Sequence, residues 1–170
     1  MLRLISSLGV TYAIDENWNA SVQLANFSTN TRQTVVITLD SLSMVQTTKT
    51  IGGNLARALR SDNASGSITL SLNYQDAIVD QIRTTTFYNA NLGWTQQNTR
   101  SKLNLGAALM AMHTISENGA NSNIGPSFNA GRPFAGDKVQ LNFVAAYLVS
   151  FVDGVAGGGI TNLALNGNYF

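Results

Sequence analysis

The sequence predicts an all-β fold of antiparallel strands, and three observations carry the prediction. Apolar and polar residues alternate with a period of two almost from end to end, as they do along strands that bury one face. Compact polar turn sequences separate the alternating runs. No stretch shows a convincing helical periodicity. The length of 170 residues fits a single domain that covers residues 1–170.

Nine strands follow from the positions of the alternating runs. The alternation is cleanest at residues 68–74, where Ile, Leu, Leu and Tyr are separated by Thr, Ser and Asn. The same arrangement recurs at residues 88–94, 103–109 and 139–151. One face of each strand therefore meets an apolar environment and the other face meets a polar one. The strands are expected at residues 2–14, 17–27, 43–60, 65–79, 84–96, 100–115, 122–134, 138–152 and 159–170.

The first segment has two interpretations. Its start, Met1 to Arg3 with the apolar residues that follow, resembles a short secretory signal. The apolar residues of segment 4–14, however, alternate with Ser, Gly and Thr. The apolar part of a signal has no reason to alternate, so we interpret this segment as the first strand.

The connections are expected to differ between the two ends of an up-and-down sheet. Compact polar turns are expected at one end, at residues 15–17, 61–63, 96–98 and 135–137. Longer connections are expected at the other end, at residues 28–33, 79–83, 117–121 and 153–159. Alternating residues on both sides of Asp40 and Ser41 are expected to extend the second and third strands into a projecting hairpin over residues 28–48.

The charge content is unusually low for a surface that meets water. Charged residues make up 11% of the chain and its net charge is +1, whereas ordinary soluble domains carry about 25% charged residues. Asn, Ser, Thr and Gln occupy the polar positions instead. The near-neutral charge argues against nucleic acid as a partner. The absence of cysteine excludes disulfides and thiolate metal sites, and no apolar run reaches the roughly 18 to 20 residues of a membrane helix.

Alternation alone fits both a soluble sandwich and a membrane barrel. In a sandwich the polar face meets bulk water and usually carries Lys and Glu, but here it carries small neutral residues, and the charges fall at strand ends or in loops. The expected strands are also longer than the roughly 5 to 6 residues of soluble strands and suit a tilted crossing of a ~25 Å apolar band. The sequence therefore predicts an antiparallel up-and-down transmembrane β-barrel, with about eight to ten strands from this chain.

Aromatic residues are placed as two belts at the membrane–water interfaces would require. The belt at the compact-turn end is expected to contain Tyr12, Trp18, Trp94, Phe134, Tyr169 and Phe170. The belt at the other end is expected to contain Phe27, Tyr74, Tyr88 and Phe151.

Residues 88–94 (YNANLGW), 103–107 (LNLGA) and 166–170 (NGNYF) resemble strands of outer-membrane β-barrel proteins of Gram-negative bacteria, in particular the Asn-rich barrels of Bacteroidetes. The resemblance covers most of the chain in texture and contains no diagnostic motif. It implies an outer-membrane location, contact with the lipid bilayer, and recognition of the terminal Phe170 by the barrel-assembly machinery. Asn168 departs from this pattern, because the alternating terminal signal favours an apolar residue there.

The odd number of strands leaves three interpretations open, since single-chain bacterial barrels usually have an even number. The count is off by one, or the chain is the C-terminal part of a larger barrel, or several chains complete one barrel as a homo-oligomer or larger membrane complex. The lack of a clear secretion signal favours the second interpretation.

Small neutral residues are expected to line the lumen. These residues are Ser67, Thr69, Ser71, Asn73, Asn89, Asn91, Asn104, Ser127, Asn129, Asn142 and Asn162. A narrow barrel would need larger side chains to fill it, so the interior is either wide and wet or plugged by another chain. We expect passive passage of small solutes with little ion preference. A non-conducting barrel that anchors or completes an outer-membrane assembly, and a secreted soluble β-rich adhesin, are the alternatives.

No enzyme, cofactor or metal site is predicted. His113 is the single histidine, and no Gly-x-Ser-x-Gly elbow or matched carboxylate pair accompanies it. The acidic residues are dispersed over separate turns, so they do not form a metal site. The glycines at 157–159 lack the Lys-Ser or Lys-Thr and the helix of a phosphate loop, so we interpret them as a flexible turn.

Overall fold

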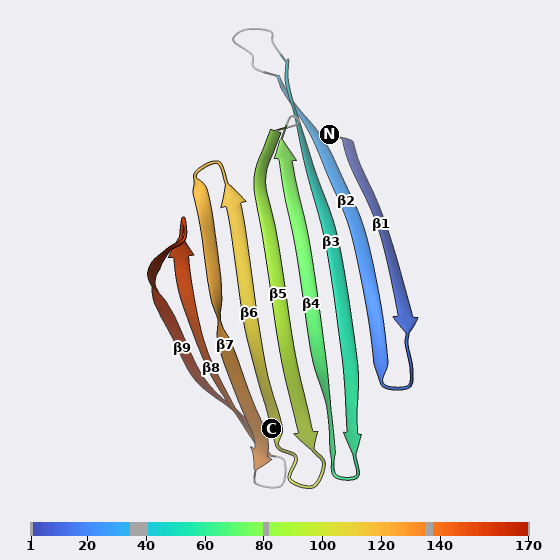
Figure 1. Ribbon diagram of the computed structural model, residues 1–170, viewed down its shortest axis with the longest axis vertical. Coiled ribbons are helices and arrows are strands. Elements are labelled where there is room, and N and C mark those ends of the chain that lie inside the picture. Colours follow the sequence, from blue (N-terminus) through green and yellow to red (C-terminus); the bar gives the residue numbers. More distant parts are fainter. Residues whose placement is uncertain (1, 35–40, 80–81, 135–137, 170) are drawn as a thin grey trace.

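A computed structural model of the chain describes residues 2–34, 41–79, 82–134 and 138–169. These residues form one sheet of nine antiparallel strands, in which each strand pairs with the next along the chain (Figure 1). The strands are β1 (Leu2–Ala13), β2 (Trp18–Thr34), β3 (Ser41–Ser61), β4 (Ala64–Val79), β5 (Ile82–Asn98), β6 (Asn104–Ser116), β7 (Gly119–Phe134), β8 (Val139–Val152) and β9 (Val155–Tyr169). The prediction of an all-β, up-and-down fold is confirmed, and the N-terminal segment forms β1. Within the described ranges no helix is long and apolar enough to cross a membrane.

The sheet is open, so the nine strands of this chain do not close into a ring by themselves. The edge strands β1 and β9 lie at opposite sides of the sheet (Figure 1). Eight antiparallel steps separate the two edges, so β1 and β9 run in the same direction. A direct pair between them would therefore be parallel, unlike every other pair in the sheet.

The sheet is a single layer without a hydrophobic core. Among the described residues no hydrophobic side chain is buried, and the large apolar residues of central strands stand well exposed, with Leu92 at 49% and Leu109 at 48%. The neighbouring strands are therefore held together by the backbone ladder and by cross-strand side-chain pairs. The described part of the chain therefore lacks the buried apolar core that is the dominant favourable contribution in water-soluble folds.

Asx-type turns close two of the compact connections. In the β1–β2 turn, Asp15 Oδ1 accepts hydrogen bonds from the backbone N–H groups of Asn17 at 2.7 Å and Trp18 at 2.8 Å. The β5–β6 turn lies later than the predicted 96–98, because β5 continues to Asn98. The Asn98 side chain then accepts from the Ser101 N–H at 2.9 Å. The predicted turn at 135–137 lies outside the described residues.

The connections at the other end are shorter than predicted. Asp153 and Gly154 have φ angles of 51° and 81° and join β8 to β9 as a two-residue turn of the kind that Asp-Gly favours. Strand β9 consequently begins at Val155, and the glycines at 157–159 belong to it. Asp153 Oδ1 also accepts from the Ala120 N–H at 2.8 Å, which ties this turn to the start of β7.

The projecting hairpin is partly described. Strands β2 and β3 pair as far as Thr34 and Ser41, and Figure 1 shows them extending beyond the rest of the sheet. Their tip, residues 35–40, lies outside the described residues, as do residues 80–81 between β4 and β5.

Close approach of backbones at Gly125 gives a test of the β7–β8 pairing. The ladder is interrupted at Gly125 and Pro126, and a Cβ atom at position 125 would overlap the carbonyl oxygen of Tyr147. Gly125→Ala is therefore expected to lower the free energy of unfolding by about 1–3 kcal/mol. The measurement is the urea midpoint of the detergent-refolded chain. Gly53→Ala is the matched control, because a Cβ there meets nothing within 4 Å. Equal midpoints for the two variants would contradict this packing.

Candidate functional site

The strand register divides the side chains between two faces of the sheet. Residues directly opposite in an antiparallel ladder project to the same side, and every second residue along a strand does so as well. One row across the sheet runs through Leu8, Leu24, Ile51, Tyr74 and Tyr88. We call the side that carries this row the apolar face and the opposite side the small-polar face.

Apolar residues, both large and small, line up on the apolar face in neighbouring rows. The row next to the first one towards the compact turns holds Val10, Val22, Gly53, Leu72, Ala90, Ala111 and Ile124. The row after that holds Tyr12, Ala20, Leu55, Leu70, Leu92, Leu109 and Pro126. The alternation seen strand by strand in the sequence thus becomes one continuous surface over neighbouring strands.

The predicted lumen residues share the small-polar face. The register places all of Ser67, Thr69, Ser71, Asn73, Asn89, Asn91, Asn104, Ser127, Asn129, Asn142 and Asn162 there. Asn73 lies opposite Asn89, and the hydroxyl groups of Ser67 and Thr95 are 3.0 Å apart across β4 and β5. This face becomes less polar on the last two strands, where Leu148 lies opposite Ile160.

The predicted interface aromatics share the apolar face. The register places Tyr12, Trp18, Tyr74, Tyr88, Trp94, Phe134, Phe151 and Tyr169 there, and Phe170 lies outside the described residues. Phe27 differs from its expected place. It stands opposite Thr48 on the small-polar face, because it is out of phase with the apolar positions of β2. The predicted aromatics fall into two groups, one towards each end of the strands, and the apolar face also carries Phe128, Phe143 and Tyr147 nearer the middle of β7 and β8.

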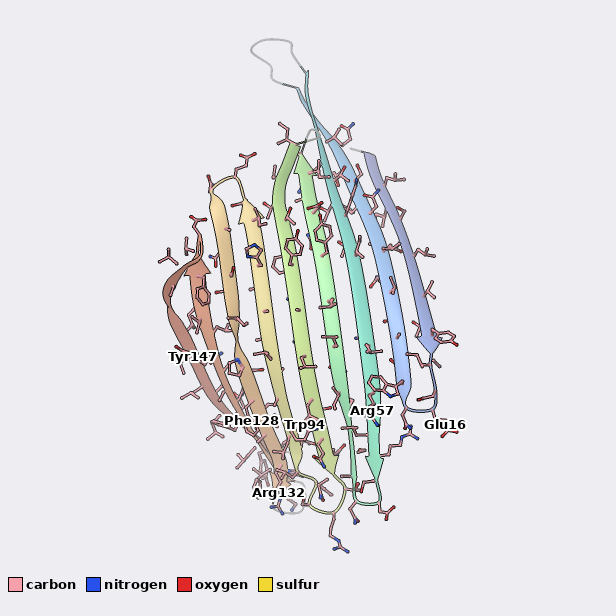
Figure 2. The ribbon with its side chains drawn as sticks, viewed as in Figure 1. Glu16, Arg57, Trp94, Phe128, Arg132 and Tyr147 are labelled. Atoms are coloured by element: carbon pink, nitrogen blue, oxygen red, sulfur yellow. The ribbon has the colours of Figure 1, made fainter. Side chains whose placement is uncertain are left out.

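Two arginines belong to the group at the compact-turn end, and the sequence reasoning missed both. The Arg57 Cζ atom lies 5.3 Å from the centroid of the Trp18 ring, and the Arg132 Cζ atom lies 5.5 Å from that of Phe134. Figure 2 shows Arg57 and Arg132 towards the compact-turn end of their strands. The missed signal was their phase, since each arginine occupies an apolar position of an alternating strand.

A buried carboxylate belongs to the group at the other end. Asp76 is 4% exposed and accepts hydrogen bonds from the Tyr74 hydroxyl and from Thr86 Oγ1, the latter at 2.8 Å. The Tyr74 and Tyr88 rings pack with centroids 5.1 Å apart. Such donors compensate the cost of placing a carboxylate on an apolar surface. Here too the residue stands in the apolar phase of its strand, which was the overlooked signal.

The same group contains a histidine–serine contact. His113 Nδ1 lies 2.7 Å from Ser122 Oγ, across the pair of β6 and β7. A hydrolytic pair would also need free hydrogen-bond donors for the developing oxyanion. Ser122 lies on β7, which pairs with β6 on one side and β8 on the other, so the backbone N–H groups around it are engaged in the sheet. The contact is well suited to joining two strands. No cluster of three metal-ligating residues occurs in the part of the chain that is described.

The stretch of apolar residues that a strand contributes to the apolar face, which we call the apolar band, lies closer to the compact turns on β9 than on β1. On β1 the apolar band is centred on Leu8. The residues that lie directly opposite one another from strand to strand, starting at Leu8, lead across the sheet to Ala156 on β9. The band on β9 is instead centred near Leu165, nine positions beyond Ala156 and closer to the compact turns. Strands that are ~4.8 Å apart and tilted by about 40° would shift a horizontal band by about ten residues over eight steps. The observed displacement is close to that value.

No protein-family model, curated protein or solved structure matches the chain in comparisons with known proteins. A function for the chain therefore has to be inferred from the two faces of the sheet and the residues that they carry.

Proposed function

We propose that the chain forms part of the wall of a transmembrane β-barrel in the outer membrane of a Gram-negative bacterium. In this proposal the apolar face meets lipid, and the small-polar face lines a water-containing lumen. The observation that carries it is the continuous apolar face of a single-layer sheet, which buries no hydrophobic side chain among the described residues. A soluble monomer rarely exposes a contiguous apolar patch above a few hundred Å², whereas a bilayer covers such a surface at no cost.

Two further features support this environment. Aromatic side chains border the apolar face at both ends, as they do where barrels meet the headgroups. The displacement of the apolar band between Leu8 and Leu165 is that of tilted strands crossing a horizontal layer. A soluble β-rich adhesin would require neither feature.

The free edges indicate that further strands complete the barrel. Strand β9 carries no charged residue and no proline, the devices with which soluble proteins protect an edge. In a bilayer every unpaired backbone group of β1 and β9 would cost free energy. An odd number of added strands would pair both edges antiparallel and give the even total usual for bacterial single-chain barrels. Two copies of this chain in one membrane orientation would instead meet at parallel seams.

The lumen side is suited to passive passage of small neutral solutes. Among the described residues, those that would line it are uncharged through the middle of the strands, and most of them are small. The described strands therefore contribute no charged ring that would select ions. The open edges favour a second candidate function, a scaffold that completes a larger outer-membrane assembly without conducting on its own. We further propose that barrel-assembly machinery inserts the chain, as the resemblance to outer-membrane barrels implies.

Refolding of the full chain into liposomes and detergent micelles tests this proposal. We expect the chain to float with the liposomes and to migrate faster on gels before heating than after it. Discrete conductance steps in planar bilayers would favour the pore, and stable insertion without conductance would favour the scaffold. A chain that stays monomeric and folded in buffer without detergent would overturn the membrane assignment.

A further inference from the structure

We propose that Arg57 and Arg132 bind the phosphate groups of anionic phospholipids at the compact-turn end of the apolar face. The inference rests on the proposed function, because it requires this face to lie in lipid. It concerns two separate lipid contacts, since β3 and β7 are four strands apart, or about 19 Å at the usual strand spacing.

The geometry of each guanidinium leaves its donors available. Arg57 lies over the Trp18 ring and Arg132 over the Phe134 ring, at 5.3 and 5.5 Å from the ring centroids. Both arginine side chains are exposed. A cation–π contact needs no hydrogen-bond acceptor, so it leaves the guanidinium with N–H donors for an anion. Within the described residues neither guanidinium is held by a carboxylate ion pair.

The positions of the two arginines on the sheet indicate which anion they would bind. Arg57 stands opposite Ile68, and Arg132 stands opposite Leu141, so both belong to rows of the apolar face. Each lies near the end of its strand, where the chain leaves the apolar band (Figure 2). Long arginine stems cover apolar surface while their charged groups reach the interface. The groups that they meet at that depth in a bilayer are lipid phosphates, which a guanidinium can bind through two parallel hydrogen bonds.

Arg60 provides a matched control on the other face. It lies three residues after Arg57 on β3 and opposite Ser65, in a row of the small-polar face. Arg60→Gln therefore removes the same charge from the same end of the same strand. Its side chain is directed away from the proposed lipid contact, so only a general attraction to anionic lipid would depend on it.

The experiment uses the full chain inserted in vesicles of equimolar phosphatidylglycerol and phosphatidylcholine. After mild extraction, native mass spectrometry counts the lipids of each kind that remain bound. We expect phosphatidylglycerol to be enriched, and each of Arg57→Gln and Arg132→Gln to reduce the enrichment by about fivefold at its own contact. Arg60→Gln should leave the enrichment unchanged. Inorganic phosphate added during extraction should not displace the bound lipid, which distinguishes a headgroup held with its acyl chains from a site for free phosphate.

Two results would overturn the inference. One is equal retention of the two lipids by the unmodified chain, and the other is an equal loss of enrichment in Arg60→Gln. Arg57→Lys guards against misfolding, because it keeps the charge but not the planar donor pair, and should keep insertion while losing part of the enrichment. Failure of the chain to float with the vesicles would count against the membrane assignment itself. Flotation without lipid preference would count against this inference alone.

Discussion

Leu92→Arg is expected to abolish stable membrane insertion, whereas Asn91→Arg, one residue earlier on β5, is expected to be tolerated. Leu92 lies in the middle of the apolar face and is 49% exposed, and Asn91 lies on the small-polar face. An arginine facing lipid at the bilayer midplane costs about 2–4 kcal/mol, while a substitution towards the lumen does not carry this penalty. The measurement is the fraction of chain that shows heat-modifiable migration after refolding into liposomes, together with its urea midpoint.

Leu92→Ala separates the introduced charge from the loss of the leucine. This variant should insert, with a urea midpoint below that of the unmodified chain, whereas Leu92→Arg should leave almost no inserted fraction. If Leu92→Arg and Asn91→Arg insert equally well, the two faces do not meet different solvents and the membrane assignment is contradicted.

Carboxylates placed on the small-polar face are expected to make the lumen cation-selective. Asn73 and Asn89 lie opposite each other on β4 and β5, so the double variant Asn73→Asp, Asn89→Asp adds two adjacent negative charges with little change in shape. The ratio of cation to anion permeability, near one in the unmodified chain, should rise by about three- to tenfold. Reversal potentials in planar bilayers under a salt gradient measure this ratio.

Acid should reverse the effect, because protonation of the new carboxyl groups removes their negative charge. Asn63→Asp is the control, since it adds the same group in the compact β3–β4 turn. A permeability ratio that does not change in the double variant would place these residues outside any conducting path.

The strands and their faces could be predicted because apolar and polar residues alternate within each segment, and this alternation shows which side chains share a face. Residues 68–74 alternate without exception, and the neighbouring strands keep the same phase across the ladder. Turn positions were less accessible from the sequence, since local hydrogen bonds decide them. The hydrogen bond from the Ser101 N–H to the Asn98 side chain places the β5–β6 turn later in the sequence than predicted. The positive φ angles of Asp153 and Gly154 form a two-residue turn, so β9 begins earlier than its glycine content indicated.

Other properties of the chain could not be predicted, because alternation does not contain them. The alternation of residues indicates the environment of each strand face, but it does not indicate how many strands form a ring. The open edges at β1 and β9 therefore became known only from the strand order of the structure. Arg57 and Asp76 were missed because the small neutral positions were taken to mark the site. Both stand on the apolar face, where aromatic or hydroxyl neighbours accommodate their charge.

The solvent of each face can be measured directly by a single-cysteine scan along β5. The chain has no cysteine, so a spin label attached at one of positions 89 to 92 reports on that position alone. In lipid bilayers, labels at Ala90→Cys and Leu92→Cys should be reached by oxygen, which dissolves in lipid. Labels at Asn89→Cys and Asn91→Cys should be reached by a water-soluble nickel complex. Labels at 90 and 92 that are shielded from both agents, or reached by the nickel complex, would contradict a lipid-facing sheet.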